Sequence, residues 1–416
     1  MDKTVCVKNL GCKVNAYECE FIMSLFLSEG YKITDENASV YVINTCTVTN
    51  EADKKSRKTI NSIKKHNPNS VVIAVGCYTQ NLYNTNKNID INADIILGNK
   101  DKSKIIEYLN EYLKNKEKIS EFYDVKYTKF EDMEINHLES HTRAFIKIQD
   151  GCDNYCSYCV IPYVRGDVKS KNKDKVLEEV KSLVNNGYKE IVLTGIHTGK
   201  YGTDLNNYNL YNLLLDLIEI DKLKRIRISS IEIVEVDDRI ISLLNNPKIA
   251  DHLHLPLQSG CDKILKLMNR RYDKKYYEER INLIRKANPN ISITTDVIVG
   301  FPGETEEDFN ETYEFCNRIG FSKIHVFPYS DRDGTKSSVM DNKVDDLVKK
   351  ERVKKLIELS NLLEKEYRNK FNNKKLDVLF ERKKLLTYTG YSSNYIEVKK
   401  IGFYKLNNIY KVKYKC

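Results

Sequence analysis

Three cysteines within eight residues constrain this chain more than any other feature. They are Cys152, Cys156 and Cys159, spaced C-x3-C-x2-C and here called the loop triad, and they follow a strand-like segment that ends at Gly151. Three thiolates on one short loop can hold three corners of an iron–sulfur cube, and because no fourth cysteine is near, one iron would be left open. Zinc is an alternative, but zinc loops usually add a second ligand pair, which is missing after Cys159. Plain structural thiols are a further alternative.

Composition places the chain among globular proteins with more than one domain. It has 416 residues, of which 41% are hydrophobic and 31% charged, enough for two or three domains with cores of their own. No apolar run approaches the roughly 18 residues needed to span a bilayer, and the chain starts without an apolar signal region. The 11 cysteines are an odd number scattered over a long chain, which argues against a secreted disulfide framework. We therefore expect a cytoplasmic protein with thiols free to bind metal.

The first 116 residues alternate between strand and helix patterns, and we assign them to one domain. Such alternation predicts a parallel sheet covered by helices. Strands are expected over residues 4–8, 40–44, 71–75 and 93–97, and helices over residues 16–29, 51–65 and 101–116.

A second set of cysteines follows the strands of this domain. Cys12, Cys46 and Cys77, here called the strand-end triad, follow the first, second and third predicted strands. Because the carboxyl ends of parallel strands gather at one edge of a sheet, we expect the three thiols to meet in space. The fourth strand ends at Gly98 and Asn99 without a cysteine, so this set would also leave one iron open. Each could instead be a buried small apolar residue, but three at equivalent strand ends argue against coincidence.

The middle of the chain resumes the alternation after a linker. Residues 117–140 lack a clear period and are interpreted as that linker. Six predicted strands between residues 141 and 370 favour an incomplete (β/α)6 barrel, similar to a TIM barrel but open, over a complete one with eight units. A long charged helix over residues 344–371 would pack on it. The strands are expected over residues 144–148, 190–194, 225–229, 252–257, 292–299 and 323–328.

Functional residues of such barrels collect at the carboxyl ends of the strands. Glycines there let a ligand approach the backbone closely, and backbone N–H groups could hold the carboxylate of a charged cofactor. The four histidines in or beside the strands are more often structural than catalytic, so none is assigned to catalysis. The candidate cofactor contacts are Tyr158, Gly195, Glu232, Gln258, Asp296 and Gly300.

The last segment, residues 371–416, is strongly basic. It contains 11 lysines and arginines against three acids and so carries +8 of the net charge of +9. Short strand patterns broken by glycines predict a small closed β-barrel. Basic residues can contact phosphates and aromatic rings can stack on bases, which favours binding of RNA. The aromatic candidates are Tyr388, Tyr391, Tyr395, Phe403 and Tyr404.

The residues around the loop triad resemble a known family. The run Gly151–Gly166 (GCDNYCSYCVIPYVRG) is similar to the signature of the methylthiotransferase branch of the radical S-adenosylmethionine enzymes. His254–Gly260 (HLPLQSG) and Asp296–Thr305 (DVIVGFPGET) also match that family, as does the strand-end triad of the amino-terminal domain. The tail resembles a TRAM domain, a small RNA-binding barrel, best over Asn394–Val398 (NYIEV). We therefore expect an α/β protein with a parallel amino-terminal domain, a radical S-adenosylmethionine core at 141–370 and an all-β carboxy-terminal domain.

The resemblance implies an enzyme with two 4Fe-4S clusters and S-adenosyl-L-methionine as cofactors. The cluster on the loop triad would bind S-adenosylmethionine at its open iron, and one electron would cleave it to a 5′-deoxyadenosyl radical. That radical would take a hydrogen from an unactivated C–H of the substrate. The cluster on the strand-end triad would carry the methylated sulfur for insertion. The two triads would then face each other across a domain interface, with the adenosine between them.

Two further stretches narrow the branch. Gly11–Asn15 (GCKVN) and Thr45–Arg57 (TCTVTNEADKKSR) look like the enzymes that act on N6-threonylcarbamoyladenosine at position 37 of tRNA. The resemblance thus implies conversion to the 2-methylthio derivative, with the tRNA anticodon stem-loop as partner and a flavodoxin or ferredoxin as electron donor. Alternatives within the family are isopentenyladenosine in tRNA and an aspartate of a ribosomal protein. An alternative of another class is an iron–sulfur RNA-binding protein without catalysis.

Overall fold

The computed structural model of the chain describes residues 3–86, 91–135 and 142–416. The chain folds into two compact units. The first comprises Met1–Ser140, Lys147–Glu179 and Ser330–Ser338, and the second comprises His141–Ile146, Val180–Tyr329 and Val339–Cys416. In this division the loop triad groups with the amino-terminal sheet. The predicted domain boundaries stay a prediction. The end of the predicted linker, at residues 136–141, lies outside the described residues.

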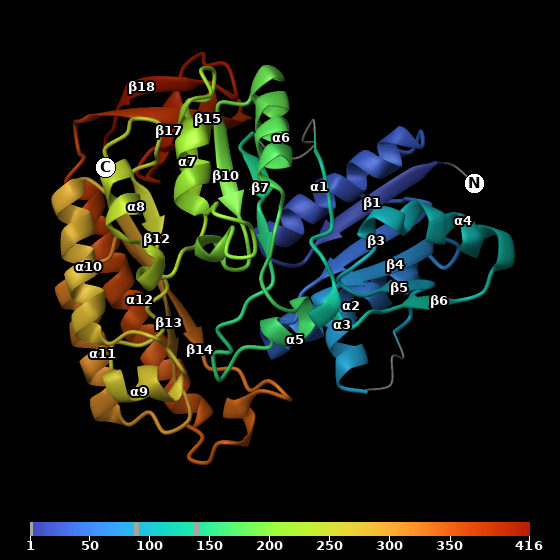
Figure 1. Cartoon of the computed structure of the whole chain (residues 1–416), viewed down its shortest axis with the longest axis horizontal. Coiled ribbons are helices and arrows are strands. Elements are labelled where there is room, and N and C mark those ends of the chain that lie inside the picture. The colour runs from blue at the N-terminus through green and yellow to red at the C-terminus, as the bar shows by residue number, and fades with distance from the viewer. Residues whose placement is uncertain (1–2, 87–90, 136–141) are drawn as a thin grey trace. The chain divides into compact units, whose positions relative to one another are not determined.

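The first unit is built on a six-stranded parallel sheet with the order β2-β1-β3-β4-β5-β6 (Figure 1). Its central strands, β3 (Val40–Thr45) and β4 (Val71–Gly76), are buried at every residue, as expected for a parallel sheet with both faces covered. The four predicted strands are confirmed, and β6 continues the sheet into the predicted linker. The other strands are β1 (Thr4–Asn9), β2 (Lys32–Ile33), β5 (Ile95–Leu97) and β6 (Ile119–Glu121).

The three helices predicted for the amino-terminal domain are confirmed, and two short helices of the first unit were not predicted. In α2 (Asn50–His66) the Thr49 side chain accepts the Ala52 N–H at the start, and basic residues occupy the last turn, where they favour the helix dipole. Helix α3 (Cys77–Asn84) was not predicted, because it starts directly at the end of β4 without a linker. The others are α1 (Lys13–Ser28), α4 (Ile105–Asn115) and the unpredicted α5 (Ile161–Arg165). Helix α6 (Lys173–Asn185) belongs to the first unit up to Glu179 and to the second unit from Val180 on.

The second unit contains the six predicted barrel strands, and all six are confirmed. They form two three-stranded sheets with the orders β11-β10-β7 and β12-β13-β14. A parallel bridge between Ile226 and Ile249 connects β11 to the segment just before β12, so the strands follow one another in chain order without closing a full barrel. The strands are β7 (Ala144–Lys147), β10 (Glu190–Thr194), β11 (Arg225–Ile228), β12 (His252–His254), β13 (Ser292–Val299) and β14 (Lys323–Pro328).

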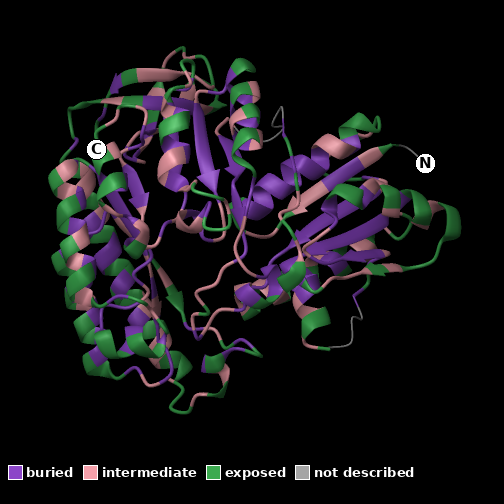
Figure 2. Cartoon of the chain, viewed as in Figure 1, coloured by how far each residue is buried: buried purple, intermediate pink, exposed green. Residues whose placement is uncertain are grey.

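Helices cover the outer side of these strands, and the central strands are buried (Figure 2). The predicted long charged helix is α12 (Asp346–Asn369), which packs along β14 through buried Leu356, Leu359 and Leu363. None of the described helices is both long and apolar enough to cross a membrane. The remaining helices are α7 (Leu210–Ile218), α8 (Asp238–Leu243), α9 (Asp262–Leu267), α10 (Lys274–Ala287) and α11 (Glu306–Ile319).

The tail forms a four-stranded antiparallel sheet with the order β17-β16-β15-β18. Its core contains Val378, Phe380, Tyr388, Val398 and Val412. The predicted closed barrel is corrected to an open half-barrel, because β17 and β18 are its two edges and pair only with β16 and β15 respectively among the described strands. The strands are β15 (Lys375–Lys384), β16 (Thr387–Ser392), β17 (Glu397–Ile401) and β18 (Ile409–Lys413).

Candidate functional site

The strand-end triad lies at the carboxyl edge of the first sheet, as its spacing in the sequence predicts. Cys12 precedes α1 after β1, Cys46 follows β3 directly, and Cys77 is the first residue of α3 after β4. The three thiols are close enough to influence one another: burial raises the pKa of Cys46 to about 11, and the charges of Cys77 and Cys12 add to this effect. Cys46 and Cys77 are buried and Cys12 is exposed. Binding of a metal would deprotonate these thiols, because a bound cation stabilises the thiolate.

Backbone and amide groups hold these cysteines in place. Gly76 has φ +113°, and a Cβ there would lie 2.6 Å from the Asn44 side chain, so only glycine allows β4 to turn directly into α3 at Cys77. Asn15 accepts from the Cys12 backbone N–H at 3.2 Å and donates to Asn44 Oδ1 at 2.8 Å. Asn99, which follows the cysteine-free strand β5, donates to Cys77 Sγ at 3.5 Å. Amide side chains from α1, β3 and the segment after β5 thus brace the triad.

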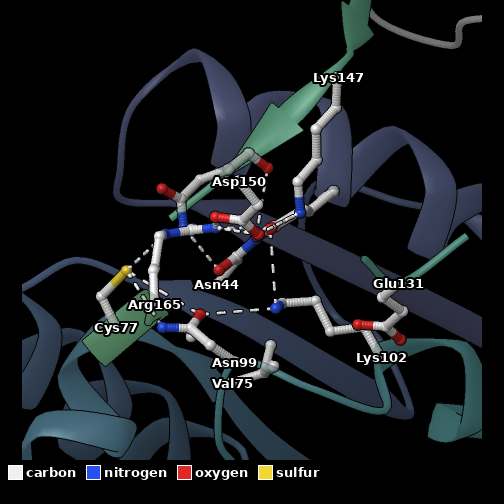
Figure 3. Close-up of polar contacts among 12 residues, drawn as sticks. Asn44, Val75, Cys77, Asn99, Lys102, Glu131, Lys147, Asp150 and Arg165 are labelled. Atoms are coloured by element: carbon white, nitrogen blue, oxygen red, sulfur yellow. Dashed lines mark hydrogen bonds and ion pairs between the residues drawn. The ribbon is translucent and has the colours of Figure 1, made fainter. Parts of the chain in front are cut away.

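A buried charge network lies against this triad, centred on Arg165 (Figure 3). Arg165 Nε donates to Cys77 Sγ at 3.3 Å, and its Nη1 donates to Asp150 Oδ1 at 2.9 Å and to Glu18 Oε1 at 3.1 Å. Lys147 contacts both carboxylates, at 2.9 Å from Glu18 and 2.7 Å from Asp150. Burial by itself would raise the pKa of Glu18, but the charges of Arg165, Lys102 and Lys147 outweigh it and hold that pKa below its ordinary value.

The loop triad is tied to the same network. The Cys152 N–H donates to the Gly166 carbonyl at 3.0 Å, and Gly166 follows Arg165 directly. Gly151, with φ +75°, has no room for a side chain, because a Cβ would lie 1.9 Å from the Asp167 carbonyl oxygen. The three thiols of the loop are half-buried. One chain of contacts therefore runs from Cys152 through Gly166 and Arg165 to Cys77, within a single compact unit.

Residues 330–338 belong to the same unit and reach the Cys46 end of the triad. Arg332, which is buried, donates from Nη2 to Thr47 Oγ1 at 2.7 Å and to Asp53 Oδ2 at 2.8 Å. Its Nη1 donates to Asn50 Oδ1 at 2.6 Å. Because Thr47 is the residue after Cys46, this arginine fixes the loop that carries the thiol without bonding to the thiol itself.

The candidate cofactor contacts are divided between the two units. Four of them follow the carboxyl ends of β10, β11, β12 and β13 in the second unit, and Asp296 lies within β13. Tyr158 lies in the first unit beside Cys159. Several have partners within the protein: Glu232 pairs with Arg270, and Asp296 Oδ2 lies 3.2 Å from His254 Nε2. The Gln258 N–H donates to the Asp296 carbonyl at 2.8 Å, and the Gly300 N–H donates to Glu304 Oε2 at 2.6 Å. Their role in binding a cofactor stays a prediction.

The residues present suit iron–sulfur chemistry. The loop triad supplies three thiols from one short loop, and the strand-end triad supplies three from the ends of β1, β3 and β4. Three thiols are the donor set of an iron–sulfur cube with one open iron. Arg165 also suits a bound group at this site, because its Nη2 is buried and has no hydrogen-bond partner among the described residues. A group with sulfur acceptors beside Cys77 would satisfy it.

Replacement of Glu18 by glutamine is expected to destabilise the fold strongly. The substitution leaves Arg165, Lys147 and Lys102 buried with one carboxylate, Asp150, to balance them, and breaking a buried ionic network typically costs about 3–5 kcal/mol. The free energy of unfolding by urea measures the effect. Because the pKa of Glu18 is lowered in the folded state, its contribution is present above about pH 4 and is lost as the pH falls. The difference between the two proteins should therefore shrink in acid.

Glu51→Gln is the matched control for that measurement. Glu51 pairs with Lys54 at 2.7 Å in the same unit, but both side chains are mostly exposed. Exposed pairs contribute about 0–1 kcal/mol. Equal losses for the two variants would mean that the buried network does not stabilise this unit.

Sequence reasoning missed most of this network. Glu18, Lys102 and Lys147 lie within helix or strand patterns, where a charged residue is normally assigned to the exposed face. Arg165 stands in the run that carries the family resemblance, and that was its only signal. Burial of its partners could not be read from the periodicity.

Comparisons with known proteins agree with this site. A model of the radical SAM superfamily matches residues 146–316, and a model described as uncharacterized protein family UPF0004 matches residues 4–98. These two matches cover the loop triad and the strand-end triad respectively.

Relatives of known name extend over nearly the whole chain. Threonylcarbamoyladenosine tRNA methylthiotransferase MtaB of Bacillus subtilis (strain 168) is 44% identical over 95% of this chain and 90% of that protein. tRNA-2-methylthio-N(6)-dimethylallyladenosine synthase of Thermoanaerobacter sp. (strain X514) is 36% identical over 90% of this chain and 81% of that protein. Among solved structures, the radical S-adenosylmethionine methyltransferase TsrM from Kitasatospora setae matches with a TM-score of 0.58 over 82% of this chain and 77% of that chain. Its identity of 13% supports a shared fold alone.

Proposed function

The chain belongs to the radical S-adenosylmethionine methylthiotransferase family, in the threonylcarbamoyladenosine tRNA branch, and from this premise we propose that it converts N6-threonylcarbamoyladenosine at position 37 of tRNA to the 2-methylthio derivative. The relative named for this activity is 44% identical over 95% of the chain. The relative named for the dimethylallyladenosine reaction is less similar, at 36%. This difference favours threonylcarbamoyladenosine over isopentenyladenosine as the substrate.

The observation that carries the proposal is the joining of the two triads by Arg165. Transfer of a sulfur to a radical carbon requires the sulfur and the radical source to reach the same atom. The contact path from Cys152 to Cys77 runs through Gly166 and Arg165 in one compact unit. Triads on unrelated surfaces would not serve one adenosine.

The two triads would hold different cofactors of the reaction. The loop triad would bind the cluster that holds S-adenosylmethionine, and the strand-end triad would bind the second cluster. When bound, these groups supply the radical and the sulfur. The protein supplies the geometry: Gly151 and Gly76 set the turns before Cys152 and Cys77, and the buried network fixes the two loops against each other. An electron donor, a flavodoxin or ferredoxin, would reduce the cluster of the loop triad.

The basic tail would bind part of the tRNA. Most of its candidate aromatic rings turn out to be structural: Tyr388 and Tyr404 pack around Phe380 in the core of the sheet, and Tyr395 stacks on His252 with ring centroids 4.7 Å apart. Tyr391 in turn stacks on Tyr395. Phe403 differs, since it is 89% exposed.

Phe403 lies on a surface that combines apolar and basic side chains. The Gly402 N–H donates to the Leu386 carbonyl at 3.2 Å, so the turn after β15 lies beside the end of β17. Leu385, Leu386, Ile401 and Phe403 are all exposed there, with Lys383 and Lys384 next in the chain. Exposed apolar residues rimmed by cations are what a single-stranded or looped RNA needs, through stacking and phosphate contacts.

Phe403→Ala is expected to weaken tRNA binding by about 1 kcal/mol, roughly five-fold in Kd, because stacking on one base is lost. Lys384→Ala is expected to remove one contact to phosphate, which lowers the slope of log Kd against log salt concentration by about 1. Fluorescence anisotropy with an anticodon stem-loop measures both. Tyr276→Ala, which removes a half-exposed ring from α10, is the control and should leave Kd unchanged. If Phe403→Ala and Lys384→Ala bound the stem-loop with the same Kd and salt dependence as Tyr276→Ala, the tail surface would not contact the RNA.

The reaction itself is tested with anaerobically reconstituted protein, S-adenosylmethionine and a reductant. We expect tRNA carrying threonylcarbamoyladenosine to gain a methylthio group, and tRNA carrying isopentenyladenosine or a ribosomal protein to gain none. Modification of either competitor at an equal rate would reassign the substrate. Binding of RNA without cleavage of S-adenosylmethionine would point to the non-catalytic alternative.

A further inference from the structure

Arg165 presents an unused hydrogen-bond donor next to a cluster-ligand cysteine. Its side chain is fully buried, and its Nε donates to Cys77 Sγ at 3.3 Å. Its Nη1 is fully engaged by carboxylates, at 2.9 Å and 3.0 Å from the two oxygens of Asp150 and 3.1 Å from Glu18. Its Nη2 is buried without a hydrogen-bond partner among the described residues.

The geometry of a guanidinium group decides where this donor points. The group is planar, and its Nε–H and Nη2–H bonds lie on the same edge, forming a fork that suits two neighbouring acceptors. One prong of that fork is on Cys77 Sγ (Figure 3). The other prong therefore points to the same side of the guanidinium as the Cys77 sulfur.

The rest of the site leaves sulfur as the matching acceptor. The carboxylates of Glu18 and Asp150 lie on the Nη1 side and hold the guanidinium in place. On the Nε side the neighbour is the Cys77 thiol, which accepts from Nε at 3.3 Å. A buried donor left without a partner costs about 1–3 kcal/mol, so an unmatched prong is expected to have an acceptor in the working protein.

We propose that Arg165 is a positioning residue that donates two hydrogen bonds to sulfur at the auxiliary cluster, from Nε to the Cys77 thiolate and from Nη2 to a cluster sulfide or the transferable sulfur beside it. The inference rests on the proposed function, since it assumes a cluster on the strand-end triad. Hydrogen bonds to cluster sulfur stabilise the more negative, reduced state and raise the reduction potential. Asp150, which lies beside the loop triad, holds the same arginine at 2.9 Å. Arg165 therefore keeps the transferable sulfur at a fixed position relative to the loop triad.

The closing experiment uses full-length protein in which the loop triad is replaced by alanine, so that the auxiliary cluster alone is present. The protein is labelled with [15N]arginine, reconstituted with iron and sulfide and reduced, and hyperfine spectroscopy is recorded on the paramagnetic cluster. We expect two inequivalent 15N couplings, one from each prong. We expect Arg165→Lys to keep the buried charge, lose both couplings and shift the midpoint potential in the negative direction.

Arg332→Lys is the matched control. Arg332 is also buried in this unit and bonds to Thr47, the neighbour of Cys46, but not to a thiol. Both couplings should persist in that variant. Iron content and thermal unfolding are measured alongside, so that loss of the cluster or of the fold is recognised.

Each outcome decides something. A cluster that assembles with a single coupling, or with none, overturns the proposed role of Nη2 and leaves the proposed function standing. An unchanged potential in Arg165→Lys overturns the stabilisation of the reduced state. Failure of wild-type Cys12, Cys46 and Cys77 to assemble any cluster overturns both the inference and the proposed function.

Discussion

Replacing Cys156 with alanine is expected to reduce cleavage of S-adenosylmethionine to the level of a protein-free control. Cys156 lies between Cys152 and Cys159 on the half-buried loop, and its loss leaves two thiolates where a cube with an open iron needs three. The cluster on this loop would supply the electron that cleaves S-adenosylmethionine, so its loss would prevent formation of the radical. Chromatography of 5′-deoxyadenosine after anaerobic incubation with reductant measures the effect.

Cys416→Ala provides the comparison for this variant. Cys416 is an exposed cysteine at the end of the chain, with the Tyr414 hydroxyl 3.7 Å from its sulfur. Its removal should leave cleavage intact. Full cleavage by the Cys156 variant would exclude the loop triad as the source of the radical and end the enzymatic interpretation.

Cys77→Ala should have an equally large effect on a different step. We expect cleavage of S-adenosylmethionine to continue while formation of the methylthio product stops, because the loop triad stays intact and the strand-end triad loses a ligand. Iron content should fall from about eight to about four per chain, as one of two four-iron clusters is lost. Mass spectrometry of the tRNA product and assay of 5′-deoxyadenosine on the same samples give the ratio of the two activities.

The two cysteine variants together separate radical formation from sulfur delivery. Arg165 lies between their loops, so either loop could be displaced by a change in the other. Thermal unfolding of both variants therefore accompanies the assays. If Cys77→Ala kept its yield of methylthio product, the strand-end triad would be structural and the sulfur would come from elsewhere.

The fold was largely predictable because the pattern of the chain is regular. In the parallel domain, β3 and β4 are buried on both faces and appear as apolar runs, so both are found within a residue of their predicted ends. The barrel strands were also found, although β14 is mostly not buried and β12 ends at His254, three residues before its predicted end. Helix α3 was missed because it starts directly after β4 and has only eight residues, so the sequence shows neither a loop before it nor a clear helical period.

The cysteines of the candidate site were predictable, and their surroundings were not. Placement of Cys12, Cys46 and Cys77 at one sheet edge follows from parallel topology alone. Burial of Glu18 and Arg165 depends on packing between segments that are 147 residues apart in the chain. No local pattern encodes such a contact. The division into compact units has the same cause, since the loop triad joins the amino-terminal sheet through these buried pairs.

The most direct test of the central claim is mass spectrometry of tRNA nucleosides from cells with and without this gene. We expect 2-methylthio-N6-threonylcarbamoyladenosine to be present in the first and absent in the second, with N6-threonylcarbamoyladenosine accumulating in its place. Restoration by the wild-type gene, but not by Cys77→Ala, would tie the loss to this chain. Unchanged 2-methylthio-N6-threonylcarbamoyladenosine in cells lacking the gene would contradict the account.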